Sequence, residues 1–284
     1  MNMHKAANIL RVAACQLSQL VRGRKIWLVL ICNFIFLQSQ VLPLQSFLRE
    51  YEADATPFLF PFLFMDPFLT ACFFFGIILL FCNAPFFTSA QKFVAIRTGK
   101  KVWAAGQILY ILCTGLLYFL ALYLMSAAVL IPRLSLKNDW GSVWNTLART
   151  EAGQLAGVYL IIPAGILNAL QPLQTVALVE IIGTLNAVFL GELLFLFNVY
   201  WKKEAGIAVA AMFLLLPTRM QSVPAILRYL MPISWMALDG WSGDLTSAGT
   251  DLKMQILLLL GAIFLLGGFC ILGCHRKEIP EIEE

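Results

Sequence analysis

The sequence is poor in charge, because Asp, Glu, Lys and Arg together make up only 13% of its 284 residues. Soluble domains carry about a quarter of their residues as charged side chains. Hydrophobic residues make up 60% of the chain, and its mean hydropathy is +0.81. A single soluble core cannot bury so much apolar surface. The composition therefore excludes an ordinary soluble protein and predicts an integral membrane protein in which lipid covers most of the surface.

Histidine is equally scarce, with His4 and His275 near the two ends of the chain. Neither a histidine metal site nor a histidine-based catalytic triad can form within the apolar segments. Gly99, Lys100 and Lys101 lack the upstream glycine and the following Ser or Thr of a phosphate-binding loop. We therefore expect no enzymatic activity, no cofactor and no ATP site in this chain itself.

Paired cysteines in exposed loops are also lacking. The seven cysteines lie nearly all within apolar runs or on the basic side of the chain described below. An odd number without paired spacing argues against a disulfide framework. We interpret them as small apolar packing residues.

Acidic residues are absent from the segment 83–103, which lies between two long apolar stretches and contains Lys92, Arg97, Lys100 and Lys101. Assigning sides by alternation of the apolar stretches places 13 of the 20 Lys and Arg on one side of the membrane: Lys5, Arg11, Arg22, Arg24, Lys25, Lys92, Arg97, Lys100, Lys101, Lys202, Lys203, Arg276 and Lys277. Such sorting predicts that this side faces the cytoplasm. It argues against a general basic surface, so nucleic acid is not an expected partner.

The apolar runs predict an all-α membrane domain that comprises the whole chain, 1–284. Residues 5–22 form an amphipathic helix that is expected to lie in the headgroup plane. Six spans are expected because a helix needs about 20 apolar residues to cross a core of about 30 Å. The predicted spans are 26–44, 67–87, 103–131, 175–200, 205–222 and 254–273, with 88–102 as a cytoplasmic loop and both termini cytoplasmic.

Two regions fit this scheme less simply. If 155–172 crossed the membrane as well as 175–200, Lys202 and Lys203 would lie outside, so we place 155–172 at the outer interface. The run 205–217 is too short to cross alone, so the fifth span is extended past Pro217, and Pro224 and Pro232 interrupt the segment after it. We therefore predict a re-entrant outer segment within 218–250, before the last span.

A few polar side chains lie within the predicted spans. Asn33 and Gln38 are expected to face other helices. Glu180 and Glu192 are 12 residues apart, about 18 Å along a helix, so they cannot form a carboxylate pair. An outer headgroup position explains Glu180 better than a functional role, whereas for Glu192 a functional site and an inter-helix hydrogen bond both remain open. Four tryptophans in the expected outer segments predict an interfacial aromatic belt: Trp140, Trp144, Trp235 and Trp241.

The order of these elements and several local sequences resemble the membrane subunit of bacterial ABC transporters, in the ABC type-2 permease family. The first cytoplasmic loop and the helix after it, NAPFFTSAQKFVAIRTGKKVWAAGQILYI, carry most of the resemblance. It continues in the region from LPLQSF to FLFMDPF, in ALQPLQ before the fourth span, and in RYLMPISW between the fifth and the sixth.

The resemblance implies an exporter permease of the bacterial cell membrane, driven by a separate ABC-type ATP-binding subunit and paired with a second, identical or similar, permease subunit. Residues 5–22 would be the connecting helix. The coupling segment would contain Phe87, Lys92, Arg97, Gly99, Lys100 and Lys101. Anchoring to lipid headgroups explains Arg97, Lys100 and Lys101 equally well.

Two other classes of function remain open. An ion-coupled secondary transporter would use Glu192 or Glu180, although the sequence lacks the internal repeats and the additional intramembrane charge typical of that class. A membrane protein with a structural or immunity role and no transport activity also fits the composition.

Overall fold

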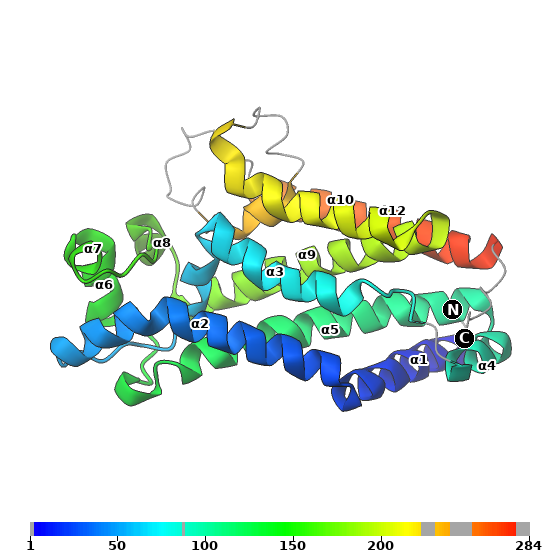
Figure 1. Ribbon diagram of the computed structural model, residues 1–284, viewed down its shortest axis with the longest axis horizontal. Coiled ribbons are helices and arrows are strands. Elements are labelled where there is room, and N and C mark those ends of the chain that lie inside the picture. The colour runs from blue at the N-terminus through cyan, green and yellow to red at the C-terminus, as the bar shows by residue number, and fades with distance from the viewer. Residues whose placement is uncertain (1–2, 87–88, 223–230, 239–251, 277–284) are drawn as a thin grey trace.

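The computed structural model describes residues 3–86, 89–222, 231–238 and 252–276. Every regular element within these residues is a helix, and the only β-type pairing there is an isolated bridge between Ala55 and Leu134. Most of the longer helices lie side by side along one long axis (Figure 1). The predicted all-α class is confirmed.

Four of the described helices are long and apolar enough to cross a bilayer. They are α2 (Arg24–Glu50), α5 (Lys100–Ala128), α9 (Pro172–Tyr200) and α12 (Leu252–Arg276). Six spans were expected. The two remaining candidates, α3 (Pro67–Phe81) and α10 (Lys203–Leu215), have 15 and 13 residues. At 1.5 Å per residue they cover about 22 and 20 Å, less than a core of about 30 Å, so the structure does not confirm them as complete crossings.

Local chemistry explains where α3 begins and ends. It begins at Pro67, as predicted, because the side chain of Asp66 accepts hydrogen bonds from the backbone N–H groups of Phe68 and Leu69 at 2.7 and 2.9 Å. It ends at Phe81 instead of continuing to 87. Beyond it, Pro85 offers no N–H for a helical hydrogen bond.

Several segments differ from the predicted boundaries. The segment 88–102 is mostly helical: α4 (Ser89–Thr98) is separated from α5 by Gly99 alone. Helix α2 continues through Pro43 to Glu50, beyond the predicted end at 44. The helix α10 passes into a 3-10 helix, η3 (Leu216–Ser222), and a second 3-10 helix, η4 (Pro232–Met236), packs back against α9. Most of the predicted re-entrant segment lies outside the described residues.

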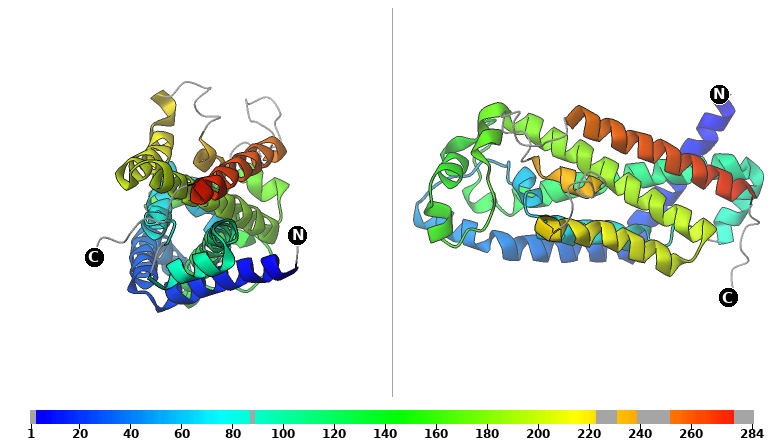
Figure 2. Two further views of the ribbon diagram at one scale, coloured as in Figure 1. Left: turned by 90° about the vertical axis from the view of Figure 1, so that its right-hand side faces the viewer. Right: turned by 90° about the horizontal axis from the view of Figure 1, so that it is seen from above.

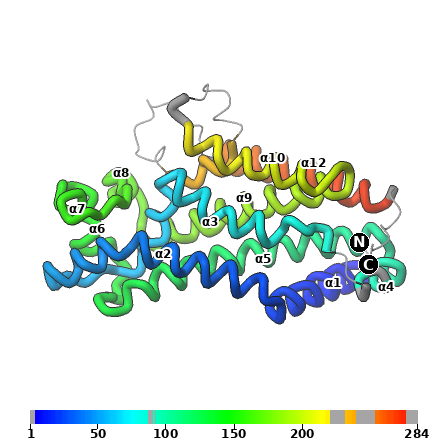
Figure 3. Tube along the Cα trace, in the orientation of Figure 1, coloured from blue at the N-terminus to red at the C-terminus, as the bar shows by residue number. Residues whose placement is uncertain are grey.

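No single helix spans 155–172. This region contains the end of α7 (Ala152–Leu155), an irregular stretch, and α8 (Ala164–Ala169). Together with α6 (Gly141–Arg149), these helices gather at one end of the molecule, beside the far end of α2 (Figure 3). We call this group α6–α8 the outer module, after the outer position that the sequence predicts for 155–172.

Aromatic side chains form the core beneath the outer module. The 3-10 helix η1 (Phe60–Phe64) is fully buried there. The ring of Phe62 lies 5.3 Å from that of Trp144, and the indole N–H of Trp144 donates to Thr56 Oγ1 at 2.9 Å. Trp140 donates to the carbonyl of Leu170 at 2.9 Å.

The predicted aromatic belt is wrong for three of its four members. Trp140, Trp144 and Trp235 are at most 9% exposed, because protein covers their rings. Trp241 lies outside the described residues. Among the described tryptophans, the two exposed by more than half are Trp27 and Trp201, at the opposite end of the molecule.

The opposite end of the molecule contains α1 (Met3–Arg22), α4, the turn between α9 and α10, and the C-terminal part of α12 (Figures 1 and 2). We call it the basic end, because most of the sorted Lys and Arg residues lie in these segments. Helix α9 runs between the two ends at the centre of the bundle, and α5, α12, α10 and α3 all pack against it.

The contact between α5 and α9 depends on glycine. A Cβ atom at Gly183 would lie 2.6 to 2.9 Å from three ring carbons of Phe119. The ring itself is fully buried, so it has no room to move. We expect Gly183→Ala to destabilise the protein by about 1–3 kcal/mol, the usual cost of overpacking. Thermal unfolding of the detergent-solubilised protein measures it.

Gly268→Ala in α12 is the matched control, because nothing lies within 4 Å of the added Cβ. Alanine favours a helix over glycine, so this variant should be unchanged or more stable by up to about 1 kcal/mol. Equal stability of the two variants would contradict the packing described here.

Candidate functional site

Helix α4 at the basic end is held firmly on one face. Gln91 and Ala95, one helical turn apart, are at most 1% exposed. The indole N–H of Trp103 in α5 donates to Gln91 Oε1 at 3.0 Å, and Gln91 Nε2 contacts Cys15 Sγ of α1 at 3.8 Å. One glutamine therefore connects α4 to both neighbouring helices.

The other face of α4 is exposed and apolar. Phe93 and Ile96 are each 75% exposed, and the neighbouring Arg97 is also exposed. Large apolar side chains beside a cation at the end of a bundle form a surface that a partner or lipid headgroups would cover. Sequence reasoning identified Arg97 but missed Phe93 and Ile96, although their three-residue spacing placed them on one helical face.

The structure brings together several residues predicted for coupling. Arg97 lies in the last turn of α4, Gly99 separates the helices, and Lys100 and Lys101 begin α5. Gly99 has φ +89°, in the left-handed region that favours glycine, which explains how α5 starts directly after α4. Phe87 lies outside the described residues. Lys92 belongs to α4, but its side chain is also outside the described part.

Helix α1 lies against α5 instead of standing apart from the bundle. A Cβ at Gly106 of α5 would lie 2.6 Å from the side chain of Val12, so glycine permits the close approach. Val12, Ala13 and Gln16 are buried in this contact, whereas Leu10 of the predicted apolar face is 61% exposed. The helix is thus packed on the protein along one side and exposes apolar side chains on the other.

Asn33 is part of a buried hydrogen-bond chain between three helices. Its Nδ2 donates to the Tyr118 hydroxyl at 2.7 Å, and that hydroxyl donates to the carbonyl of Phe73 at 2.5 Å. A Cβ at Gly76 would lie 2.5 Å from the same hydroxyl, so α3 leaves space for the chain. Asn33 therefore links α2, α3 and α5. This confirms the prediction that its side chain faces other helices.

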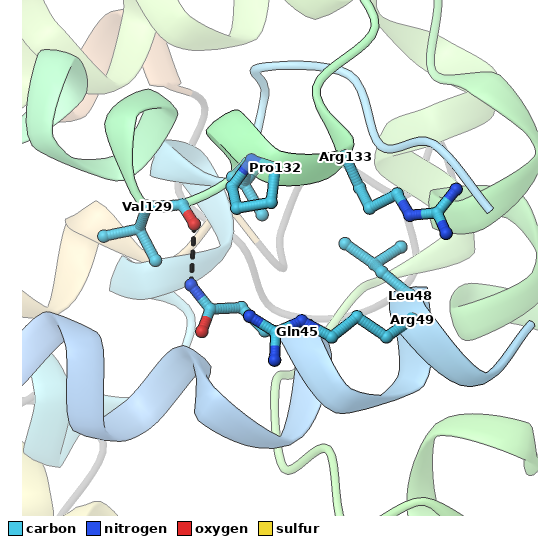
Figure 4. Close-up of a pocket in the computed structure, with 7 residues that line it drawn as sticks. Gln45, Leu48, Arg49, Val129, Pro132 and Arg133 are labelled. Carbon is cyan, nitrogen blue, oxygen red and sulfur yellow. Dashed lines mark hydrogen bonds between the residues drawn. The ribbon is translucent and has the colours of Figure 1, made fainter. Parts of the chain in front are cut away.

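Nearer the outer module, Gln38 bonds within α2 itself, and its partner Gln45 makes the contact to the end of α5. Its Nε2 donates to Gln45 Oε1 at 3.0 Å, and Gln45 Nε2 donates to the carbonyl of Val129 at 2.7 Å. Figure 4 shows this second bond beside Pro132, Arg49 and Arg133. The cavity between them measures about 10 Å³, room for about one water molecule and too little for a substrate.

Glu192 is the most deeply buried acid among the described residues, with 1% of its surface exposed. Its Oε2 has no hydrogen-bond partner. Its Oε1 lies against Gly267 of α12, where an added Cβ would come within 3.1 Å. Glu180 is half-buried, and its Oε1 also has no partner. The two glutamates belong to different levels of α9, as their spacing predicted.

A larger hollow, of about 460 Å³, lies in the outer module. Its walls are the end of α6, helix α7 and the irregular stretch 158–162, with Leu147, Val158 and Ile162 among the apolar lining. It lies at the opposite end of the molecule from α4.

The described residues contain no group of three or more His, Cys, Asp or Glu side chains that could hold a metal ion. The features with clear functional geometry are therefore the exposed face of α4 and the buried carboxyl of Glu192.

The chain of hydrogen bonds at Asn33 can be tested by a double-mutant cycle. We expect Asn33→Ala and Tyr118→Phe each to cost about 0.6–1.7 kcal/mol of stability, the range for hydrogen bonds between membrane helices. The double variant should cost less than the sum, because both changes remove the same bond. Unfolding in detergent measures all three variants, with exposed Cys32→Ala as the control. Strictly additive losses would contradict the bond.

Comparisons with protein-family models, with curated proteins and with solved structures found no match for this chain.

Proposed function

We propose that this chain is the membrane-spanning permease subunit of an ABC exporter of the bacterial cell membrane. A separate ATP-binding subunit would supply the energy, and the permease would move its substrate by alternating access. The exposed face of α4, with Phe93, Ile96 and Arg97, is the observation that carries the proposal.

The two faces of α4 suit a contact through which the ATP-binding subunit would apply force to the permease. The buried face is fixed to α1 and α5 through Gln91, so a push on the exposed face cannot be absorbed by a flexible loop. Phe93 and Ile96 would enter an apolar groove of the ATP-binding subunit. Arg97 would pair with carboxylates at its rim, which favours one orientation.

The direct continuation of α4 into α5 supports the same role. Because Gly99 is the only residue between them, a movement of α4 reaches the base of a 29-residue helix without an intervening loop. Alternating access then requires that the ATP-binding subunit binds the two conformations of the permease with different affinity.

The positions of the chain ends and the lipid-facing helices bear on topology and assembly. Helix α1 and the C-terminal part of α12 lie at the same end of the molecule, which supports cytoplasmic positions for both termini (Figure 1). Six crossings would require α3 and α10 to be completed by the irregular segments beside them. Most residues in the apolar spans of α2 and α12 are not buried within the chain, and lipid and a second permease subunit would cover them.

An ion-coupled transporter is the second candidate, and the burial of Glu192 favours it. Ionisable groups within membrane helices often mark ion or proton pathways. Glu192→Gln keeps the shape of the side chain and removes its charge. We expect ATP-driven transport to continue in this variant, because energy enters at α4.

Vesicles energised either with ATP or with a proton gradient measure this difference. If the wild type transports with a proton gradient alone and Glu192→Gln abolishes that transport, the permease proposal is contradicted and the ion-coupled one is supported. Glu151→Gln, at an exposed acid of the outer module, is the control.

The contact at α4 can be tested by co-purification of the ATP-binding subunit. We expect the triple variant Phe93→Ala, Ile96→Ala and Arg97→Glu to lose at least tenfold in affinity, because about 1.4 kcal/mol corresponds to that factor and the variant removes two apolar anchors and a charge. Phe75→Ala, at an aromatic side chain of α3 that is 56% exposed, is the control. Unchanged co-purification in the triple variant would refute the contact.

A further inference from the structure

The short connection that follows α3 is held by side chains from four other helices. Because α3 ends at Phe81, its last carbonyl groups lack helical partners and need other donors. The structure supplies those donors at the basic end, where residues 80–86 meet α1, α2, α9 and α10.

Asn198, in the last turn of α9, makes the central contact. Its Nδ2 donates to the carbonyl of Cys82 at 3.0 Å and also to the carbonyl of Ala84. Lys203, the first residue of α10, donates through Nζ to Asn83 Oδ1. Three consecutive residues of the connection are therefore bound by the adjoining ends of α9 and α10.

Two further donors come from the N-terminal helices. Lys25 Nζ of α2 donates to the carbonyl of Leu80 at 3.4 Å, and Gln16 Nε2 of α1 donates to the carbonyl of Phe86 at 3.2 Å. Five carbonyl or amide oxygens from Leu80 to Phe86 are thus satisfied by helices that are distant in sequence. A connection held in this way is a fixed part of the bundle.

At the basic end, α9 is tightly packed against α10 and α12. A Cβ at Gly206 of α10 would lie 2.8 Å from Phe197 Cβ, and one at Gly273 of α12 would lie 2.7 Å from the ring of Tyr200. Movement of Asn198 would therefore be shared by α10 and α12, because neither helix has space to slide past α9.

We propose that Asn198 and Lys203 form a joint that transmits displacement from the α3–α4 connection to α9, α10 and α12. This inference rests on the proposed function, because the displacement would start at α4, which begins at Ser89, three residues after Phe86. The joint gives α4 a second route into the bundle besides its direct continuation into α5. Asn198 and Lys203 are positioning residues, since they act through the connection and not on a substrate.

The first test uses the chain alone, in lipid nanodiscs. Asn198→Ala combined with Lys203→Ala should raise amide hydrogen exchange at least tenfold in both 82–86 and 198–203, because each segment loses the other's support. Asn145→Ala is the matched control, since it removes an amide side chain that donates to a backbone carbonyl in α6 at 2.8 Å. Exchange that stays as slow as in the wild type would overturn the joint.

Two milder single variants test whether misfolding of the double variant explains its faster exchange. Lys203→Ala alone changes an exposed side chain and should raise exchange in 82–86 by a smaller factor. Asn198→Asp keeps the volume of the side chain but replaces its donor by an acceptor, and it should act like Asn198→Ala. If Asn198→Asp folds and leaves exchange unchanged, the hydrogen bonds do not hold the connection.

The second test uses the complex with the ATP-binding subunit. Spin labels at exposed Leu28 of α2 and Met212 of α10 report a distance with and without ATP and vanadate. We expect the wild type to show a nucleotide-dependent shift and the Asn198→Ala, Lys203→Ala variant to show a smaller one while still binding the subunit, because the direct route through α5 remains. A shift retained in full in that variant would overturn the transmission role.

The two tests also separate this inference from the proposed function. If the wild-type chain binds no ATP-binding subunit, the proposed function fails, and with it the transmission of force from α4. The exchange experiment on the chain alone still decides whether the joint exists. If the subunit binds and the full nucleotide-dependent shift persists in the variant, the proposed function stands. The transmission role of Asn198 and Lys203 is then refuted.

Discussion

Close packing of α9 against its neighbours is the interaction on which the rest of this structure depends. Within a bilayer, lipid tails are as apolar as the side chains, so helices associate by van der Waals contact and hydrogen bonds instead of by the hydrophobic effect. Gly115, Gly183, Gly191, Gly267 and Gly273 supply that contact, since a Cβ at each would come within 3.1 Å of atoms on a neighbouring helix. Helix α9 can therefore be the centre of the bundle although it carries Glu192.

The two ends of the bundle use polar groups differently. At the outer module, indole N–H groups donate to the carbonyl of Leu170 and to the hydroxyl of Thr56, and they hold an aromatic core together. At the basic end, Gln91 connects α4 to α1 and α5, and Asn198 and Lys203 bind the connection that follows α3. Both arrangements follow from the same constraint, because buried backbone and side-chain polar groups must find partners. At the basic end, this rigidity adjoins the exposed apolar side chains of α4, Phe93 and Ile96.

Much of the architecture could be predicted from the sequence, because it depends on local composition. The apolar runs predicted the four long helices, and proline after an acid predicted the start of α3 at Pro67. The charge-sorted segment 88–102 pointed to the basic end, but it was expected to be a loop, because a charged run without strong periodicity gives no clear helical signal. Phe93 and Ile96 were overlooked because their exposure depends on which helices pack against the other face of α4.

The sequence by itself determined the helical class, the apolar lengths and the concentration of positive charge in certain segments, because each follows from the transfer of side chains between water and lipid. Tertiary structure decided that Trp140 and Trp144 are core residues instead of an interfacial belt, that Asn33 bonds to Tyr118, and that Asn198 reaches the connection after α3. Asn33 and Tyr118 are 85 residues apart in the sequence, and Asn198 and Cys82 are 116 residues apart. No local pattern specifies such a pairing, since it arises only when glycine positions let the helices approach one another.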